Sequence, residues 1–140
     1  MREVDAIVVG SGPNGLAAAI ALAQAGRSVR VLEGSETIGG GARSAELTLP
    51  GFLSDICSAV HPIGAASPFF RSLPLARHGL EWIEPPFALA HPFDDGTAAI
   101  LARSIDETAD SRGPDGPVYR RLVAPLVADA DLLAKEILAP

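Results

Sequence analysis

The first 33 residues constrain this chain more than any other part of it. An apolar stretch at 4–9 runs into a turn with the glycine spacing G-x-G-x-x-G, and an Ala/Leu-rich run at 13–26 follows. A second apolar stretch at 28–33 ends in an acid, Glu33. This order predicts a strand, a helix and a second strand parallel to the first, with the glycines at the first strand-to-helix turn.

The glycine turn predicts a site for a dinucleotide. Gly10 lets the strand turn sharply, Gly12 leaves room for a pyrophosphate, and Gly15 allows the helix to pack closely on the strand. The phosphates would face the free N–H groups at the start of the helix, where the helix dipole favours negative charge. The candidate site also includes the other residues of the turn, Ser11, Pro13 and Asn14.

Glu33 is expected to accept hydrogen bonds from the ribose hydroxyls of the adenosine. Its negative charge would repel a 2′-phosphate, which argues against NADP as the ligand. The alternative is that the glycines only make a tight turn and Glu33 is an exposed strand end. The complete pattern of strand, turn, helix and acid favours the binding site.

A second glycine cluster, Gly39-Gly40-Gly41, follows Glu33, with Arg43 close behind. With this element the sequence resembles the FAD-dependent amine oxidase and phytoene desaturase superfamily, most closely its phytoene-dehydrogenase-related branch. The resemblance implies that the glycines lie against FAD and that Arg43 supports its phosphate or ribityl region. NAD dehydrogenases lack this second cluster, so the expected cofactor is FAD. The usual family pattern has the Arg directly after a Gly-Gly doublet, where this chain has Gly41.

The resemblance extends through the segments 49–62, 94–96 and 113–121. It implies an α/β fold: an incomplete Rossmann-like βαβ FAD-binding core, residues 1–60, followed by the start of an α+β substrate domain, residues 61–140. Members of the superfamily are several times longer than this chain of 140 residues. We therefore expect an N-terminal part of such a protein, either truncated or one half of a split system.

The function implied by the resemblance is that of a flavin-dependent oxidoreductase of the dehydrogenase or desaturase type. Its substrate would be a small apolar organic molecule of isoprenoid-like or amine-like chemistry, and a complementary C-terminal chain is an expected partner. No catalytic residue is nominated. The alternatives are a non-catalytic dinucleotide-binding fragment, a split-enzyme subunit, an NAD-linked enzyme and a remnant without function.

Charge and cysteine content narrow the function classes further. The formal net charge of −6 provides no basic surface for nucleic acid or an anionic membrane. The acidic start does not resemble a signal peptide, and the apolar run at 16–25 is too short to cross a bilayer. The single cysteine, Cys57, allows no intrachain disulfide, and its spacing from the histidines matches no zinc site, so no metal is expected. These features favour the cytoplasm.

The remaining elements are expected from local patterns. We predict strands at 45–49, 81–83, 87–91 and 97–102, with a hairpin turn at Asp95-Gly96 between the last two. Helices are predicted at 67–76, interrupted by Pro74, at 104–110, where Ser104 begins a capping box, and from Pro117 onward with a kink at Pro125.

Overall fold

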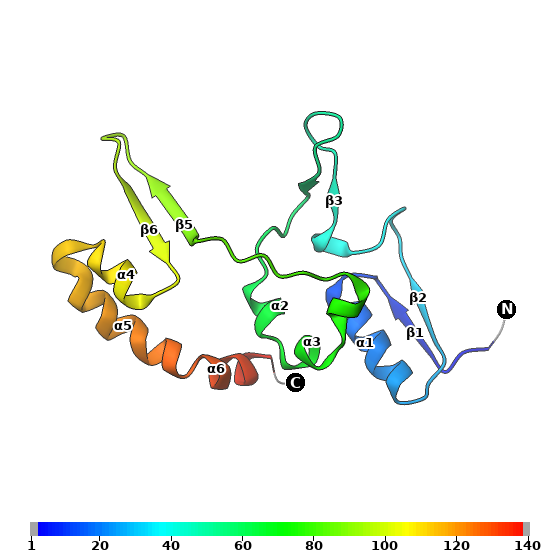
Figure 1. Cartoon of the computed structure of the whole chain (residues 1–140). Coiled ribbons are helices and arrows are strands. Elements are labelled where there is room, and N and C mark those ends of the chain that lie inside the picture. Colours follow the sequence, from blue (N-terminus) through cyan, green and yellow to red (C-terminus); the bar gives the residue numbers. More distant parts are fainter. Residues whose placement is uncertain (1–2, 139–140) are drawn as a thin grey trace. The chain divides into compact units, whose positions relative to one another are not determined.

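The computed structural model describes residues 3–138, and in it the N-terminal glycine turn joins a strand to a helix as predicted (Figure 1). Strand β1 (Ala6–Val9) leads into helix α1 (Pro13–Gln24), which is followed by strand β2 (Val29–Leu32). The two strands pair in parallel, with Ala6 opposite Val29. The expectations that depend on Met1–Arg2 and on Ala139–Pro140, about a leader and about the end of the chain, lie outside the described residues.

The chain leaves α1 through Gly26, which the sequence predicts as the last residue of the helical stretch. Gly26 has a φ of 78°, and the N–H of Arg27 donates to the carbonyl of Leu22 at 3.0 Å. This left-handed glycine after the helix satisfies carbonyls that the last turn would otherwise leave unpaired. The chain can therefore reverse direction within a few residues and begin β2 alongside β1.

One face of the β1–β2 pair is covered by α1. A β-carbon on Gly15 of α1 would lie 3.6 Å from Cγ1 of Val8, so Val8 faces the helix. Because side chains alternate along a strand, Ile7 and Val9 face the other way, and 59% and 83% of their surfaces are exposed. The pair thus leaves one apolar face uncovered in the part of the chain that the structure describes.

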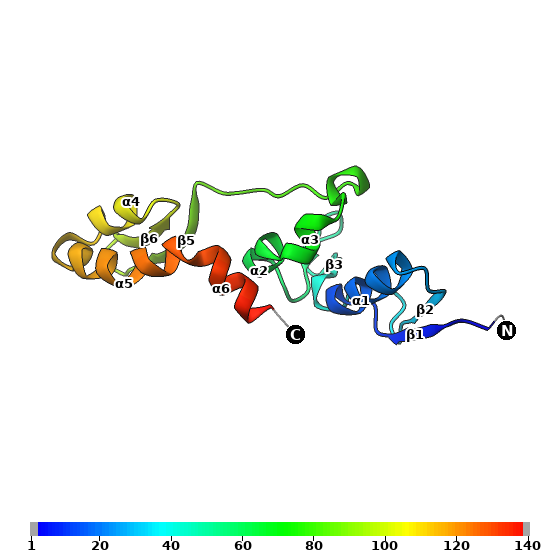
Figure 2. The ribbon, with the colours of Figure 1, turned by 90° about the horizontal axis from the view of Figure 1, so that it is seen from below.

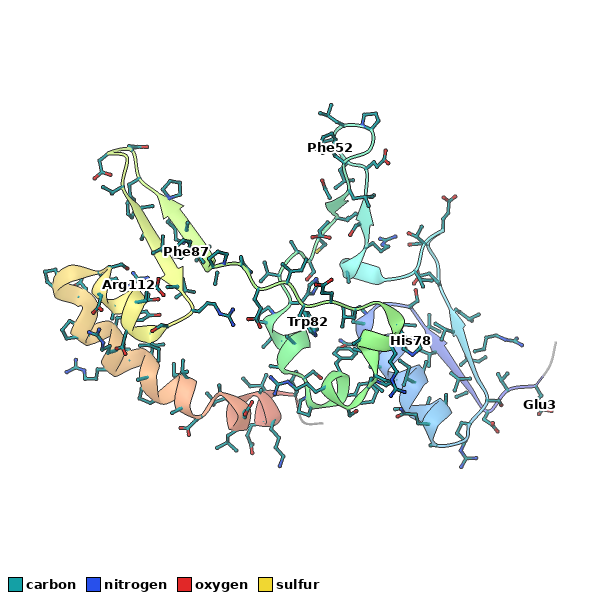
Figure 3. The ribbon with its side chains drawn as sticks, in the orientation of Figure 1. Glu3, Phe52, His78, Trp82, Phe87 and Arg112 are labelled. Atoms are coloured by element: carbon teal, nitrogen blue, oxygen red, sulfur yellow. The ribbon has the colours of Figure 1, made fainter. Side chains whose placement is uncertain are left out.

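The second glycine cluster forms a short 3-10 helix, η1 (Gly40–Ala42). It leads into an antiparallel hairpin of β3 (Ser44–Ala45) and β4 (Ser54–Asp55). The predicted strand at 45–49 is therefore confirmed only at its first residue, because the chain loops out from 46 to 53 around Gly51 at a φ of 85°. Figure 3 shows Phe52 within this projecting loop.

The structure divides into two compact units, Met1–Gly64 and Ala65–Pro140. Helix α2 (Pro62–Ala66) spans the boundary between them. The assignment of residues 1–60 to a cofactor domain and of 61–140 to a substrate domain stays a prediction.

The helical stretch predicted at 67–76 is interrupted at Pro74, as expected. Helix α3 (Pro68–Ser72) has Ser67 as its N-cap, and the 3-10 helix η2 (Leu75–His78) follows Pro74. The prediction of a strand at 81–83 is wrong, because these residues are irregular. Two prolines follow at 85–86, and proline has no N–H to donate to a strand ladder.

The predicted hairpin consists of β5 (Phe87–Pro92) and β6 (Ala98–Ala102), which pair antiparallel. In the turn, one carboxylate oxygen of Asp95 accepts hydrogen bonds from the N–H of Thr97 at 2.9 Å and from its hydroxyl at 2.6 Å. Gly96 has a φ of 84°, which explains why the Asp-Gly pair predicts this turn.

Helix α4 (Ile105–Asp110) begins as predicted, with the side chain of Ser104 accepting from the N–H groups of Asp106 and Glu107. The 3-10 helix η3 (Gly113–Asp115) connects it to α5 (Gly116–Ala128). A β-carbon on Gly116 would lie only 2.4 Å from the carbonyl oxygen of Ala109. The start of α5 can therefore approach the end of α4 only because this residue is glycine.

The C-terminal helical region consists of α5 and α6 (Ala130–Ile137), whereas the sequence predicts one helix with a kink at Pro125. Pro125 lies inside α5, and the interruption comes at Asp129, between α5 and α6. Figure 2 shows these two helices running in different directions. The helix continues for one turn beyond the proline, since the N–H of Asp129 still donates to the carbonyl of Pro125 at 3.1 Å. None of the helices in residues 3–138 has the length and apolar character needed to cross a membrane.

Candidate dinucleotide-binding site

The first glycine turn brings the end of β1 against the start of α1. Gly10 has a φ of 95°, a conformation that favours glycine, and a β-carbon on Gly15 would lie 2.2 Å from the carbonyl oxygen of Gly10. Gly12 is the N-cap of α1, and its carbonyl accepts from the N–H of Leu16 at 2.9 Å. Amides in the first helical turn have no carbonyl partner within the helix, so those of Asn14 and Gly15 are candidate donors to an anion.

Glu33 follows β2 and lies beside the first glycine turn. Its Oε2 accepts hydrogen bonds from the backbone N–H of Ser11 at 2.9 Å and from the Ser11 hydroxyl at 2.5 Å. Its Oε1 accepts from the N–H of Ser35 at 2.9 Å. The structure therefore places the predicted acid at the end of β2 and joins it directly to the glycine turn.

These donors also determine the charge of Glu33. Hydrogen bonds from the hydroxyl and then the N–H of Ser11, followed by the N–H of Ser35, lower the pKa of Glu33 from 4.5 to about 2, although burial acts in the opposite direction. A carboxylate that accepts several hydrogen bonds is stabilised in its charged form. Glu33 is thus an anion over the whole physiological pH range.

The second glycine cluster lies against the first turn. The N–H of Gly39 donates to the carbonyl of Ser11 at 3.1 Å, and a β-carbon on Gly40 would lie 2.9 Å from Cα of Gly12. Gly41 faces Cys57: its β-carbon would lie 3.9 Å from Sγ, an ordinary contact distance. The structure thus brings Gly39 and Gly40 into the region of Gly10–Gly15 and Glu33, as the cofactor prediction requires.

Arg43 folds back over this second cluster. Its Nε donates to the carbonyl of Gly40 at 2.9 Å, and its Nη1 lies 3.5 Å from Oγ1 of Thr37. The guanidinium has five N–H donors, so these contacts leave donors for a phosphate or a ribityl hydroxyl. Arg43 therefore has a structural contact of its own in addition to its predicted role.

Three neighbours of the site could not be found from the sequence. Ser35 contacts Glu33 through its backbone, and Ser58 donates its N–H to the carbonyl of Gly41 at 2.9 Å. The Ser58 hydroxyl lies 3.3 Å from Nδ1 of His61. No spacing rule identifies these contacts, and the one between Ser58 and Gly41 depends on how the chain returns to the second glycine turn. Among residues 3–138, no three His, Cys, Asp or Glu side chains gather as a metal site.

A parallel strand–helix–strand unit with this glycine turn and this acid defines a Rossmann-like dinucleotide-binding fold. Residues 8–73 match the family model of the NAD(P)-binding Rossmann-like domain, which confirms the predicted fold class. This part of the chain therefore has a Rossmann-like α/β fold.

Several proteins similar to this chain are oxidoreductases by name. A limonene dehydrogenase subunit from Castellaniella defragrans is 29% identical over 79% of this chain and 20% of its own length. Pyridine nucleotide-disulfide oxidoreductase domain-containing protein 2 from Mus musculus is 34% identical over 74% of this chain and 18% of its own length. (S)-6-hydroxynicotine oxidase from Paenarthrobacter nicotinovorans is 33% identical over 90% of this chain and 28% of its own length.

These matches confirm the resemblance to the FAD-dependent oxidoreductase superfamily, and the chain is a homologue of these oxidoreductases. The aligned part of this chain spans less than a third of the length of each of these relatives.

Proposed function

We propose that this chain is the N-terminal FAD-binding part of a flavin-dependent oxidoreductase. The close approach of Gly40 to Gly12 is the observation that carries the proposal. Two glycine turns that meet without side chains between them form a continuous backbone surface, and a long dinucleotide needs such a surface on more than its ADP half. An NAD-linked enzyme needs only the first of these turns.

The proposal gives each part of the surface a role. Glu33 would accept a hydrogen bond from the adenosine ribose, and the amides of Asn14 and Gly15 would face the pyrophosphate. The second turn, Gly39–Gly41, would lie against the flavin half, with the guanidinium of Arg43 donating to its phosphate or ribityl region. FAD, when bound, would supply the acceptor for a hydride or electrons taken from the substrate.

The proposed substrate is a small apolar organic molecule, oxidised in a dehydrogenase or desaturase reaction. Two relatives support this class by name, since one is a limonene dehydrogenase subunit and the other a hydroxynicotine oxidase. The first name denotes an apolar hydrocarbon, and the second denotes a small organic amine. We also propose a cytoplasmic location, which the single cysteine of the chain supports.

A further polypeptide segment is part of the proposal, supplied by a complementary chain. Parallel sheets are normally covered on both faces, yet Ile7 and Val9 are 59% and 83% exposed, and β1 pairs on one edge only in the described residues. The uncovered face is suited to a helix, and the open edge of β1 is suited to another strand. The second candidate function, a non-catalytic dinucleotide-binding module, would not need this segment.

Titration of the purified chain with FAD, NAD and NADP, followed by calorimetry and by the visible spectrum of the flavin, tests the proposal. We expect FAD to bind, NAD to bind more weakly and NADP most weakly, because Glu33 repels a 2′-phosphate. Binding of NAD without binding of FAD would contradict the flavin assignment. FAD binding without turnover, even after addition of the downstream part of a homologue, would favour the non-catalytic module.

A further inference from the structure

Ser11 stands in the middle of the first glycine turn and is only 2% exposed. Each of its polar groups has a partner within the protein. Its N–H and its hydroxyl both donate to Oε2 of Glu33, at 2.9 and 2.5 Å, and its carbonyl accepts from the N–H of Gly39 at 3.1 Å. Ser11 thus connects the acid after β2 with the second glycine turn.

These contacts set Ser11 apart from its neighbours in the turn. Its N–H points at a carboxylate, so it is not a donor to a pyrophosphate. Its hydroxyl is buried, and leaving a buried hydroxyl without a hydrogen-bond partner costs about 1–3 kcal/mol. A ligand is therefore not expected to break the hydrogen bond between this hydroxyl and Glu33. The bond between Ser11 and Glu33 is therefore expected to persist when a ligand binds.

The same contacts give the two carboxylate oxygens of Glu33 different hydrogen-bonding roles. A carboxylate has roughly four acceptor positions, two on each oxygen. Ser11 fills both positions of Oε2, and the N–H of Ser35 fills one position of Oε1 at 2.9 Å. One acceptor position on Oε1 is therefore the place where a ribose hydroxyl can donate.

We propose that Ser11 is a positioning residue that commits Oε2 of Glu33 to the protein, so that Oε1 alone receives one hydroxyl of the adenosine ribose. This inference rests on the proposed function, because it assumes an adenosine diphosphate group at this site. It deepens that function by assigning ribose recognition to a pair of residues, Ser11 and Glu33, instead of to the acid alone. Ser11 acts through Glu33 and does not touch the ligand.

The experiment compares two ligands in the same protein sample, ADP and 2′,3′-dideoxy-ADP, which lacks the ribose hydroxyls. In Ser11→Ala, Glu33 loses the hydroxyl bond that holds its carboxylate in place, and we expect ADP affinity to fall about tenfold. Affinity for dideoxy-ADP should change less than about twofold, because Glu33 makes no bond to that ligand. The ratio of the two affinities does not depend on the fraction of folded protein, so it is valid even if the variant is less stable.

Ser35→Ala is the matched control. It removes a serine hydroxyl two residues from Glu33 but keeps the backbone N–H that contacts Oε1, so the ratio should equal that of the unchanged protein. If the role of Ser11 were purely structural, Ser11→Ala would lower the affinities for both ligands equally, and this result would overturn the inference. An unchanged ratio in Ser11→Ala would overturn it as well.

A carboxyl titration of Glu33 by NMR separates the failure of this inference from the failure of the proposed function. Ser11→Ala should raise the pKa of Glu33, because the Ser11 hydroxyl is the largest cause of its lowering. If the unchanged protein binds neither ADP nor FAD, the proposed function fails and the ribose role of Ser11 fails with it. If ADP binds but the titration of Glu33 is the same in both proteins, only the role of Ser11 fails.

Discussion

A β-carbon added to Gly40 would lie 2.9 Å from the Cα of Gly12, so the two glycine turns of this chain meet backbone to backbone. Carbon atoms that are not bonded to each other do not approach this closely, and Gly40 also has a left-handed φ of 57°. The contact therefore depends on glycine for both space and conformation.

Gly40→Val is expected to separate the two turns and to lower FAD affinity by more than about tenfold, because the added side chain must displace the backbone of Gly12. Calorimetric titration with FAD measures the effect. Gly34→Ala is the control, since a β-carbon there meets nothing within 4 Å and the φ of Gly34 is not left-handed. Equal affinities in Gly40→Val and Gly34→Ala would contradict the proposed role of the second turn.

Arg43→Ala is expected to lower the affinity for FAD about tenfold and the affinity for ADP less than about threefold, because the guanidinium is assigned to the flavin half of the ligand. It also removes the bond from Nε to the carbonyl of Gly40, so circular dichroism should accompany the binding measurements. Arg27→Ala, a change just after α1 in the same unit, should leave both affinities unchanged. A larger loss for ADP than for FAD would place Arg43 at the other half of the cofactor.

Acid should destabilise the chain partly through three carboxyl groups. Glu33, Asp5 and Asp95 each accept both a hydroxyl and an N–H bond from one Ser or Thr residue, Ser11, Ser28 and Thr97 respectively. In each case the side-chain bond is the largest cause that lowers the pKa, and the backbone bond comes next.

The sign of the pH effect follows from these directions. A group with a lowered pKa in the folded state contributes stability above its unfolded pKa and loses it as the pH falls through the folded pKa. For Glu33, the contribution should disappear as the pH falls from 4.5 to about 2. Thermal unfolding followed between pH 6 and about 2 should show a smaller acid-induced loss in Glu33→Gln than in the unchanged protein. Identical pH profiles would contradict the assignment.

Thr108→Val should destabilise the second unit by about 1–3 kcal/mol, because it leaves a buried amide without a partner. Thr108 is fully buried, and its Oγ1 accepts from the N–H of Ala102 at 3.0 Å and lies 3.0 Å from the carbonyl of Ser104. Valine has nearly the same volume, so the change removes the hydrogen bonds and little packing. Chemical denaturation measures the difference, with the exposed Thr48→Val as the control. A loss no larger than that of the control would show that this cluster is not important for stability.

Sequence reasoning succeeded where the cause of a structure is local. The turn at Asp95-Gly96, the end of α1 at Gly26 and the N-cap at Ser104 were all predictable, because each depends on the conformational preference of one or two residues. The strand at 81–83 was predicted wrongly for the same reason: its composition favours a strand, but the described chain provides no neighbouring strand for it.

The candidate site could be predicted residue by residue but not as an arrangement. Gly10, Gly12, Gly15 and Glu33 follow a spacing that indicates a dinucleotide, whereas no pattern assigns Ser11 to Glu33 or Ser58 to Gly41. Those contacts join residues far apart in the sequence, and their geometry depends on the path of the chain between them.

By itself, the sequence determined a parallel strand–helix–strand unit and the kinds of residue that line its glycine turn, since propensity and spacing act over a few residues. Only the tertiary structure decided that the second glycine turn lies on the first and that one oxygen of Glu33 belongs to Ser11. The physical reason is that close backbone contact and hydrogen bonding require atoms within a few ångströms of one another. That distance is set by folding of the whole unit and not by the local sequence.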